Sequence, residues 1–326
     1  MREENEVLVE TKNLAMYFPV GKSFFGTAKK TLKAVDGVDL TITRGQTFGL
    51  VGESGCGKTT VGRCMTRLYE PTGGQVLYEG SDITRLDYQQ MIPFRRKIQM
   101  IFQDPYASLD PRMTVVAIVK EPLKVRNDLS PKDKDDRVRQ LIELVGLKQD
   151  HLMRYPHEFS GGQRQRIGIA RALASDPEFI VCDEPISALD VSIQAQIINT
   201  LEELQQKLGL TYMFVSHDLR MVEHISHRVG VMYLGCLVEV AQASELFGNM
   251  LHPYTRALLS AVPIPDPVAA AQALRIHLQG DVPTPIDPPS GCRFRGRCPE
   301  ALPICAETRP ALRDVGGGHC VACHRV

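Results

Sequence analysis

The stretch GESGCGKT, residues 52–59, has the residue types and the spacing of a phosphate-binding loop. It follows an apolar run at 47–51 that predicts a strand, and it opens a predicted helix, as the pattern G-x-x-x-x-G-K-[ST] requires. Glycines let main-chain N–H groups converge on phosphate oxygens, and a helix start favours an anion. We expect Lys58 to neutralise the β- and γ-phosphates and Thr59 to offer its hydroxyl to Mg²⁺. The residues expected at the nucleotide are Gly52, Glu53, Ser54, Gly55, Cys56, Gly57, Lys58, Thr59 and Thr60.

Cys56 lies inside this loop, beside Lys58 and the predicted helix start, and both of these lower the pKa of a thiol. We expect a reactive thiol that bound nucleotide protects from alkylation. The alternative is a small residue that fills an unimportant position. Cys64 and Cys182 fall in a predicted helix and a predicted strand, where a cysteine is expected to be inert core.

A second run, FIVCDE at 179–184, is an apolar strand that ends in two carboxylates. Asp183 is expected to bind Mg²⁺, and Glu184 to polarise the attacking water as a general base. An acidic end on a core strand is common by itself. Its place after a phosphate-binding loop makes the catalytic interpretation strong.

A third motif lies between them, where Ser160, Gly161, Gly162 and Gln163 open a predicted helix. A hydroxyl N-cap followed by two glycines forms a second site for an anion. Two phosphate sites in one chain predict a dimer in which the helix of each chain closes on the nucleotide of the other. The alternative is an ordinary capped helix.

Alternating strand and helix patterns must position these motifs. Buried strands are predicted at 38–42, 47–51, 98–102, 179–183, 211–215 and 228–234. Helices are predicted at 57–68, 132–145, 161–175, 192–208 and 219–226, and Ser130-Pro131 has the form of a helix start. This alternation indicates an α/β core with a largely parallel sheet.

The bulk properties exclude several classes of protein. A chain of 326 residues suggests one large domain with an extension, or two domains. A formal net charge of zero gives no support for a nucleic-acid-binding surface. The sequence contains no apolar run long enough to span a membrane, and its N-terminus lacks the apolar stretch of a signal peptide. We therefore expect a cytosolic protein whose thiols stay reduced.

The composition changes after residue 262, where a proline-dense linker is expected over 263–290, followed by a cysteine-rich tail. Five of the nine cysteines lie in this tail. Cys292, Cys298, Cys305 and Cys323 are separated by five, six and seventeen residues, which suits either Zn²⁺ or a [4Fe–4S] cluster. The spacings are looser than those of zinc ribbons, and the tail has few large apolar residues, so a metal centre would stabilise it. The alternative is that the four cysteines only pack a small subdomain.

The ordered motifs resemble those of the ATP-binding subunits of ABC transporters. The series comprises the phosphate loop, Gln103 after a strand, SGGQ at 160–163, CDE at 182–184, SALD at 187–190 and His217 after YMFVS. The resemblance covers about 7–262 and implies an α/β P-loop ABC ATPase cassette, with a RecA-like core and a helical subdomain at about 104–175. It implies that Gln103 senses Mg²⁺ and the attacking water, that Asp190 communicates across the dimer, and that His217 contacts the γ-phosphate. Tyr17 or Phe18 would stack on adenine. A lone histidine such as His217 is otherwise more often a packed core residue.

Longer stretches are similar to the peptide-importing branch, including IFQDPYASLDPRMTV and HPYTRALLSAVPIPDP. The tail is most similar to that of the second ATP-binding subunit of oligopeptide importers. The resemblance implies an ABC domain at 1–262, a metal-binding extension at 263–326, and a [4Fe–4S] cluster on Cys292, Cys298, Cys305 and Cys323, with Cys320 spare. It also implies ATP and Mg²⁺ as cofactors and a peripheral place on the cytoplasmic face of the membrane. The implied partners are a second homologous ATPase subunit, two permease subunits and an extracytoplasmic peptide-binding protein.

The predicted catalytic set is complete: Glu184, His217, Gln103 and Lys58. This set predicts an ATPase, and the resemblance implies that it energises oligopeptide uptake. One alternative is the same role in a dipeptide or nickel importer. Another is a soluble ABC ATPase of DNA repair or translation, but such proteins carry a long coiled coil or two cassettes. This chain has one set of motifs and no long heptad run.

Overall fold

The computed structural model describes residues 6–21, 30–126, 128–262, 276, 278–280, 283–288 and 290–326. The chain divides into two compact units. Unit 1 contains Glu6, Thr43–Gln46 and Leu86–Val215, and unit 2 contains Val7–Ile42, Thr47–Arg85 and Ser216–Val326. The predicted linker at 263–290 lies mostly outside the described residues. The predicted domain boundary at 262 stays a prediction.

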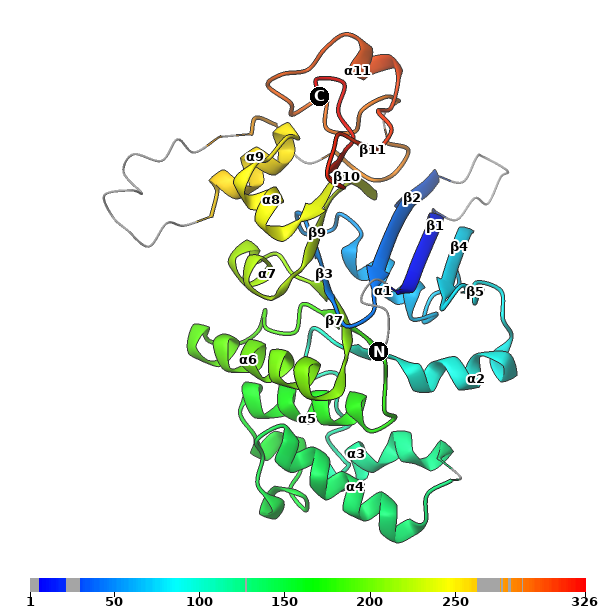
Figure 1. Ribbon diagram of the computed structural model, residues 1–326, viewed down its shortest axis with the longest axis vertical. Coiled ribbons are helices and arrows are strands. Elements are labelled where there is room, and N and C mark those ends of the chain that lie inside the picture. The colour runs from blue at the N-terminus through cyan, green and yellow to red at the C-terminus, as the bar shows by residue number, and fades with distance from the viewer. Residues whose placement is uncertain are drawn as a thin grey trace. The chain divides into compact units, whose positions relative to one another are not determined.

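Unit 1 combines parallel strands with a group of helices (Figure 1). Its elements are α2 (Tyr88–Lys97), β6 (Ile98–Ile101), α3 (Val115–Lys120), η1 (Glu121–Val125), α4 (Pro131–Leu144), η2 (Gln149–His151), η3 (Pro156–Glu158), α5 (Gly161–Leu173), β7 (Phe179–Asp183), α6 (Val191–Leu208) and β8 (Thr211–Val215). The strands run in the order β8, β7, β6 and are parallel. Every residue of β7 and β8 is buried, which explains their unbroken apolar runs.

Three helices of unit 1, α4, α5 and α6, begin within one residue of the predicted starts, whereas α2 and α3 were not predicted. Ser130 caps α4 and forms a capping box with Asp133, as Ser130-Pro131 indicated. α3, α4 and α5 pack against one another. They lie within 104–175, the range predicted for a helical subdomain, although that division is itself still a prediction.

Unit 2 contains two groups of strands and the cysteine-rich tail (Figure 1). Its elements are β1 (Val7–Val20), β2 (Lys30–Thr43), β3 (Thr47–Val51), α1 (Lys58–Met65), β4 (Gly73–Tyr78), β5 (Ser81–Asp82), α7 (Leu219–Ile225), β9 (Arg228–Tyr233), β10 (Cys236–Gln242), α8 (Ala243–Gly248), α9 (Pro253–Ser260), α11 (Ile304–Glu307), β11 (Arg313–Asp314) and β12 (Cys320–Val321). One sheet has the order β2, β1, β4, β5, and the other runs β11, β12, β10, β9, β3 within this unit.

The predicted strands and helices are all present, but the sheets are less parallel than expected. β3 pairs with β9 in parallel, as predicted. Beyond β9, the pairs of β9 with β10, β10 with β12 and β12 with β11 are antiparallel. The antiparallel pairing of β4 with β1 and β5 was not predicted. The largely parallel sheet is therefore right for unit 1 and only partly right for unit 2.

The tail is built into the packing of unit 2. β12 extends the sheet beside β10, where Val321 lies opposite Glu239. Phe294 is 1% exposed, and its ring centroid lies 5.2 Å from that of Tyr233 and 5.4 Å from that of Tyr254. The tail is thus anchored by main-chain pairing and by one buried aromatic ring. Among the helices in the described part of the chain, none has the length and apolar character to cross a membrane.

Candidate functional site

Left-handed glycines shape the predicted phosphate-binding loop, which joins β3 to α1. Gly52 has a φ of 152° and Gly57 a φ of 108°. A Cβ at Gly52 would lie 2.2 Å from the carbonyl oxygen of Met232, and one at Gly57 would lie 2.1 Å from that of Ala34. Only glycine fits at these two positions, because both the backbone conformation and the space exclude a side chain.

Lys58 begins α1, and its ammonium group turns back into the loop. Nζ donates to the carbonyl oxygens of Gly52 at 2.8 Å and Glu53 at 3.0 Å, and the residue is 4% exposed. A cation fixed beside a helix start suits a polyphosphate ligand. The other predicted contacts occupy the exposed turn of the loop and the first turn of α1: Ser54, Gly55, Thr59 and Thr60.

Cys56 is not the activated thiol that the sequence suggested. It is 4% exposed, and burial raises the pKa of its thiol. Lys58 Nζ lies 3.8 Å from Sγ and opposes this shift, but burial outweighs it. The expectation of a lowered pKa is therefore wrong. Cys64 and Cys182 are buried, as expected, and burial raises the pKa of Cys64 to about 12.

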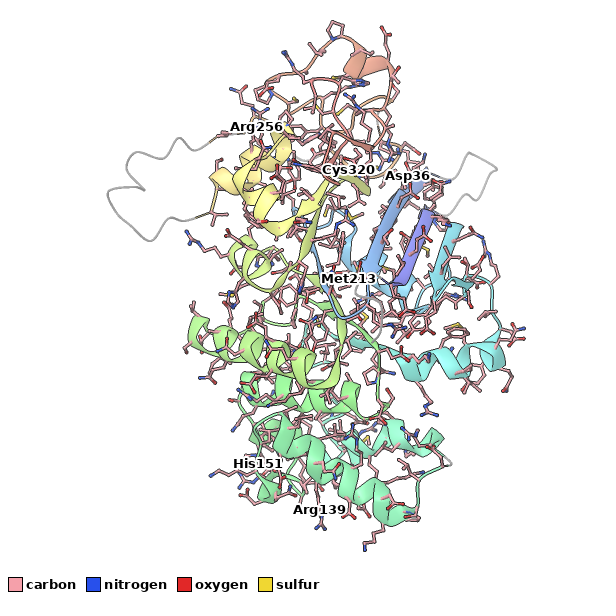
Figure 2. All side chains as sticks on the ribbon, in the orientation of Figure 1. Asp36, Arg139, His151, Met213, Arg256 and Cys320 are labelled. Atoms are coloured by element: carbon pink, nitrogen blue, oxygen red, sulfur yellow. The ribbon has the colours of Figure 1, made fainter. Side chains whose placement is uncertain are left out.

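The two aromatic candidates for adenine have different neighbours. The Tyr17 hydroxyl donates to Asp36, which Figure 2 shows on β2, and the Lys33 ammonium lies 5.4 Å from the centroid of the Tyr17 ring. Burial and the hydrogen bond to Asp36 raise the pKa of Tyr17 to about 12. Phe18 packs edge-on against Tyr69, with the ring centroids 5.8 Å apart. Both rings are partly exposed on β1, and which one stacks on adenine stays a prediction.

In unit 1, Glu184, the predicted general base, is hydrogen-bonded to Gln103, the residue expected to sense Mg²⁺ and the attacking water. Gln103 Nε2 donates to Glu184 Oε2 at 2.9 Å. Glu184 follows the last residue of β7 with a φ of 44°, a left-handed conformation that is uncommon outside glycine. Its N–H donates to the Val215 carbonyl oxygen at 2.9 Å. Strained backbone of this kind gathers at functional sites, so the geometry agrees with a catalytic carboxylate. Asp183, the predicted Mg²⁺ ligand, is 1% exposed.

The SGGQ motif starts α5 as predicted. The Ser160 hydroxyl accepts from the N–H of Gln163, and the Gln163 side chain accepts from the N–H of Ser160. A Cβ at Gly162 would lie 2.4 Å from Ile193, and one at Gly161 3.1 Å from Leu189, so the second glycine is required for packing on the segment that opens α6. The helix start is thus a capped, exposed N-terminus.

Asp190 and His217 are the remaining predicted site residues. Asp190 precedes α6 and is exposed, and within the described residues its side chain accepts no hydrogen bond from that helix start. His217 is also exposed, so the packed-core alternative does not apply. Asp218 next to it caps α7 by accepting from the N–H groups of Arg220 and Met221. Both predicted residues can therefore meet a partner or ligand, while their roles stay predictions.

Four of the five tail cysteines lie near one another. Burial and the neighbouring thiolates of Cys305, Cys298 and Cys323 raise the pKa of Cys292. Burial, Cys323 and Cys305 act on Cys298 in the same direction. All nine cysteines are free thiols. No three or more His, Cys, Asp or Glu side chains in the described part of the chain converge as a site for a metal ion. The predicted metal centre is therefore not confirmed.

Cys320, which was expected to be spare, has electrostatic neighbours other than the four cysteines, and its spare role stays a prediction. Burial and Asp314 raise the pKa of Cys320, whereas Arg228 lowers it. The main chain of Cys320 lies in β12. The preceding residue, His319, is 3% exposed, and its Nε2 lies 2.8 Å from Glu239 Oε1. Glu239 is fully buried, so this histidine has a structural partner in the sheet.

Two residues that contact the loop were missed from the sequence. The N–H of Glu53 donates to the Tyr254 hydroxyl at 2.9 Å, and Arg297 donates to the Glu53 carboxylate at 2.9 Å. Tyr254 lies within the HPYTRALL stretch, which is similar to the peptide-importing branch but has no motif of known role at this tyrosine. Arg297 stands among several arginines of the tail, and no local pattern distinguishes it from them.

Two family models match the chain. The model of the ABC transporter family matches residues 35–187, which include the phosphate loop, Gln103, the SGGQ motif and Glu184. The model of the oligopeptide/dipeptide transporter C-terminal region matches residues 238–305, which include three of the tail cysteines.

The chain is similar over nearly its whole length to curated proteins. It is 56% identical to the putative oligopeptide transport ATP-binding protein YkfD of Bacillus subtilis, over 97% of this chain and 95% of the relative. It is 52% identical to the oligopeptide transport ATP-binding protein AppF of the same organism, over 98% of this chain and 97% of the relative. It is also 52% identical to the oligopeptide transport ATP-binding protein OppF of Salmonella typhimurium, over 99% and 98%.

Solved structures support the fold. A dimeric ATP-binding cassette in a post-hydrolysis state, MJ0796 bound to ADP and Pi, matches with a TM-score of 0.65 and 29% identity, over 72% of this chain and 99% of that one. The cassette cbiO1 from Clostridium perfringens matches with a TM-score of 0.63 and 24% identity, over 75% of this chain and 92% of that one.

Proposed function

The chain belongs to the ATP-binding proteins of ABC-type oligopeptide transporters, and we propose that it hydrolyses ATP to drive the uptake of oligopeptides across a membrane. The main support for catalysis by Glu184 is its hydrogen bond with Gln103. An amide holds a carboxylate that directly follows a buried strand ending in Asp183, on a strained backbone.

The residues have separable tasks in this proposal. Main-chain N–H groups of the loop and Lys58 bind the phosphates and neutralise their charge. Glu184 accepts the proton of the attacking water, Gln103 orients the Glu184 carboxylate, and His217 contacts the γ-phosphate. Mg²⁺ supplies further neutralisation of the phosphate charge when it is bound. Its predicted ligands are oxygens, as this cation prefers: Thr59, Gln103 and Asp183.

We also propose that the chain works in a pair with a second homologous ATPase subunit, on two permease subunits and an extracytoplasmic peptide-binding protein. The exposed Ser160 at the start of α5 and the exposed Asp190, whose side chain does not cap α6 within the described residues, support a face that meets a second cassette. A relative of known structure is described as dimeric. This assembly would hold the chain at the cytoplasmic face of the cell membrane.

Glu184→Gln tests the catalytic assignment. We expect ATP binding to stay and the rate of hydrolysis to fall by about 10²–10⁴-fold, because the amide accepts no proton from water. Glu203→Gln is the matched control, since Glu203 is exposed on α6 and pairs with Lys207. Steady-state hydrolysis by Glu184→Gln within a few-fold of the wild type would overturn the assignment. Growth on oligopeptides as the sole amino-acid source separates oligopeptide import from nickel import.

For the tail, we propose a [4Fe–4S] cluster on Cys292, Cys298, Cys305 and Cys323. Their mutual electrostatic contact supports a shared group. In such a cluster each thiolate binds a different iron atom, so the four sulfurs lie farther apart than around one ion. This agrees with four neighbouring thiols that do not form a single-ion site within the described residues. The cluster would staple a tail whose apolar core is small.

Anaerobic purification with metal analysis tests the cluster. We expect iron and acid-labile sulfide in the wild type, their loss in Cys298→Ser, and no loss in the control Cys320→Ser. Stoichiometric zinc in a colourless protein would replace the cluster by a zinc site. A protein without metal would leave four cysteines that only pack the tail.

A further inference from the structure

The phosphate-binding loop is held in place by the C-terminal tail of the same unit. Arg297 Nη1 donates to both carboxylate oxygens of Glu53, at 2.9 and 3.1 Å. The side chain of Arg297 is 10% exposed and that of Glu53 is 26% exposed. Because the pair is largely shielded from water, salt screens it less than a surface ion pair, and the charge-assisted hydrogen bonds are strong.

Main-chain hydrogen bonds of Glu53 connect this ion pair to the rest of the loop. Its N–H donates to the Tyr254 hydroxyl at 2.9 Å, and its carbonyl oxygen accepts from Lys58 Nζ at 3.0 Å. Arg297, Tyr254 and Lys58 thus hold the side chain, the N–H and the carbonyl of one residue. A shift of Glu53 would therefore move the Lys58 ammonium as well.

The main chain around Arg297 is held by hydrogen bonding and packing. Its N–H donates to the carbonyl oxygen of Phe294 at 3.0 Å, and Phe294 is buried against Tyr233 and Tyr254. A second arginine of the tail, Arg293, donates to the Leu234 carbonyl oxygen and to Asp36. The guanidinium of Arg297 is consequently presented to Glu53 by a packed segment.

The negative charge of Glu53 makes its contact with Arg297 relevant to nucleotide binding. A carboxylate in a loop that receives a polyphosphate repels the ligand unless a cation neutralises it. Lys58 has to serve the phosphates, so a different cation must neutralise Glu53. Arg297 occupies that place, and the tail therefore supplies a charge that the loop lacks.

We propose that Arg297 is a positioning residue of the ATP site: it acts through Glu53, neutralising this carboxylate and fixing the loop, so that the C-terminal tail sets the affinity for nucleotide. This inference rests on the proposed function of the loop in binding ATP.

A double-mutant cycle in the full chain tests the inference. Binding of a fluorescent ATP analogue is measured for the wild type, Arg297→Gln, Glu53→Gln and the double variant. We expect Arg297→Gln to raise the Kd by roughly 10- to 100-fold, since removing one partner leaves a shielded charge unpaired. We expect Glu53→Gln in the same chain to restore most of the affinity, because the repelling charge is gone. A tail that merely folds less well would not be rescued by a change in the loop.

Arg295→Gln is the matched control, because the Arg295 guanidinium donates to the carbonyl oxygens of Ser290 and Ala306 within the tail. It should bind ATP like the wild type. An unchanged Kd in Arg297→Gln, or a double variant as weak as Arg297→Gln, would overturn the inference. Failure of the proposed function is separate, since it would appear as wild-type binding that does not depend on Lys58 in a Lys58→Ala variant.

Discussion

At the scale of single residues, backbone conformation decides where the reactive groups point. A left-handed backbone costs a residue other than glycine about 1–3 kcal/mol, so its neighbours must hold Glu184 in that state. Val215 accepts from its N–H, and the Ser187 hydroxyl donates to its carbonyl oxygen at 3.1 Å. Its carboxylate leaves the line of β7 and meets Gln103.

Burial, too, acts at this scale, and it predicts a slow reaction of Cys56 with alkylating reagents. Because burial raises the pKa of the thiol, less thiolate is present near pH 7.5 than in an exposed cysteine. We expect iodoacetamide to label Cys56 at least about tenfold more slowly in the folded chain than in urea, as followed by peptide mass spectrometry. Equal rates in the folded and unfolded chain would contradict this.

At the scale of elements, α5 shows how one helix serves both packing and the site. Its first turn is capped by Ser160 and lies against the segment that opens α6, and most of its later residues are buried. Gly162 and Gly168 are both helical glycines, yet they stand in different surroundings. A Cβ at Gly162 would lie 2.4 Å from Ile193, whereas one at Gly168 would meet no described atom within 4 Å.

These two glycines predict opposite effects of the same substitution. Gly168→Ala should raise the free energy of unfolding by about 0.5–1 kcal/mol, because alanine favours a helix and has room there. Gly162→Ala should lower it by about 1–3 kcal/mol through overpacking. Urea unfolding of both variants without nucleotide measures the difference. Two shifts of the same sign would contradict this difference in the space around the two glycines.

Elements with local signals could be predicted from the sequence, and elements with remote partners could not. The buried parallel strands β7 and β8 are unbroken apolar runs. The starts of α4 and α5 are marked in the sequence by their N-cap serines, Ser130 and Ser160. β1 was missed because Asn13 is left-handed and a register shift interrupts its alternation. β10 contains Glu239, whose partner His319 is 80 positions away. The phosphate loop, the SGGQ motif and the acidic end of β7 were predicted for the same local reason, and Gln103, Asp190 and His217 were predicted from the family resemblance. Arg297 was missed because it meets Glu53 across 244 positions.

At the scale of the whole molecule, α9 and the tail share one aromatic cluster. Phe294 packs against Tyr233, Tyr254 and His252, with the His252 and Phe294 ring centroids 5.7 Å apart. His252 also caps α9 by accepting from the N–H of Tyr254 at 3.0 Å. The cap requires an unprotonated Nδ1, so it is lost when the imidazole takes up a proton. The stability of α9, whose Tyr254 packs on Phe294 of the tail, therefore depends on the protonation state of His252.

This dependence predicts a loss of stability in mild acid. Burial, with a smaller effect of Arg256, lowers the pKa of His252 from 6.5 to about 4. Since the folded pKa lies below the unfolded one, the stabilisation is complete above pH 6.5 and is lost as the pH falls towards 4. Between pH 7 and pH 5 this loss amounts to about 2 kcal/mol.

His252→Asn isolates the effect, because asparagine can still cap α9 but does not titrate in this range. Between pH 7 and pH 5, the free energy of unfolding of the variant should fall less than that of the wild type. The difference between the two falls should be about 2 kcal/mol. Urea unfolding at the two pH values provides the measurement. Parallel pH profiles of the two proteins would assign the acid sensitivity to other groups.

The contact between Arg297 and Glu53 also orders events during biosynthesis. Glu53 leaves the ribosome 244 residues before Arg297, an interval on the order of 10–50 s at usual rates of translation. From the proposed role of Arg297, we expect the nascent loop to carry an unneutralised carboxylate during that time and to bind nucleotide more weakly than the finished chain. Competence for ATP then arrives late, when the tail has been translated and has folded onto its unit.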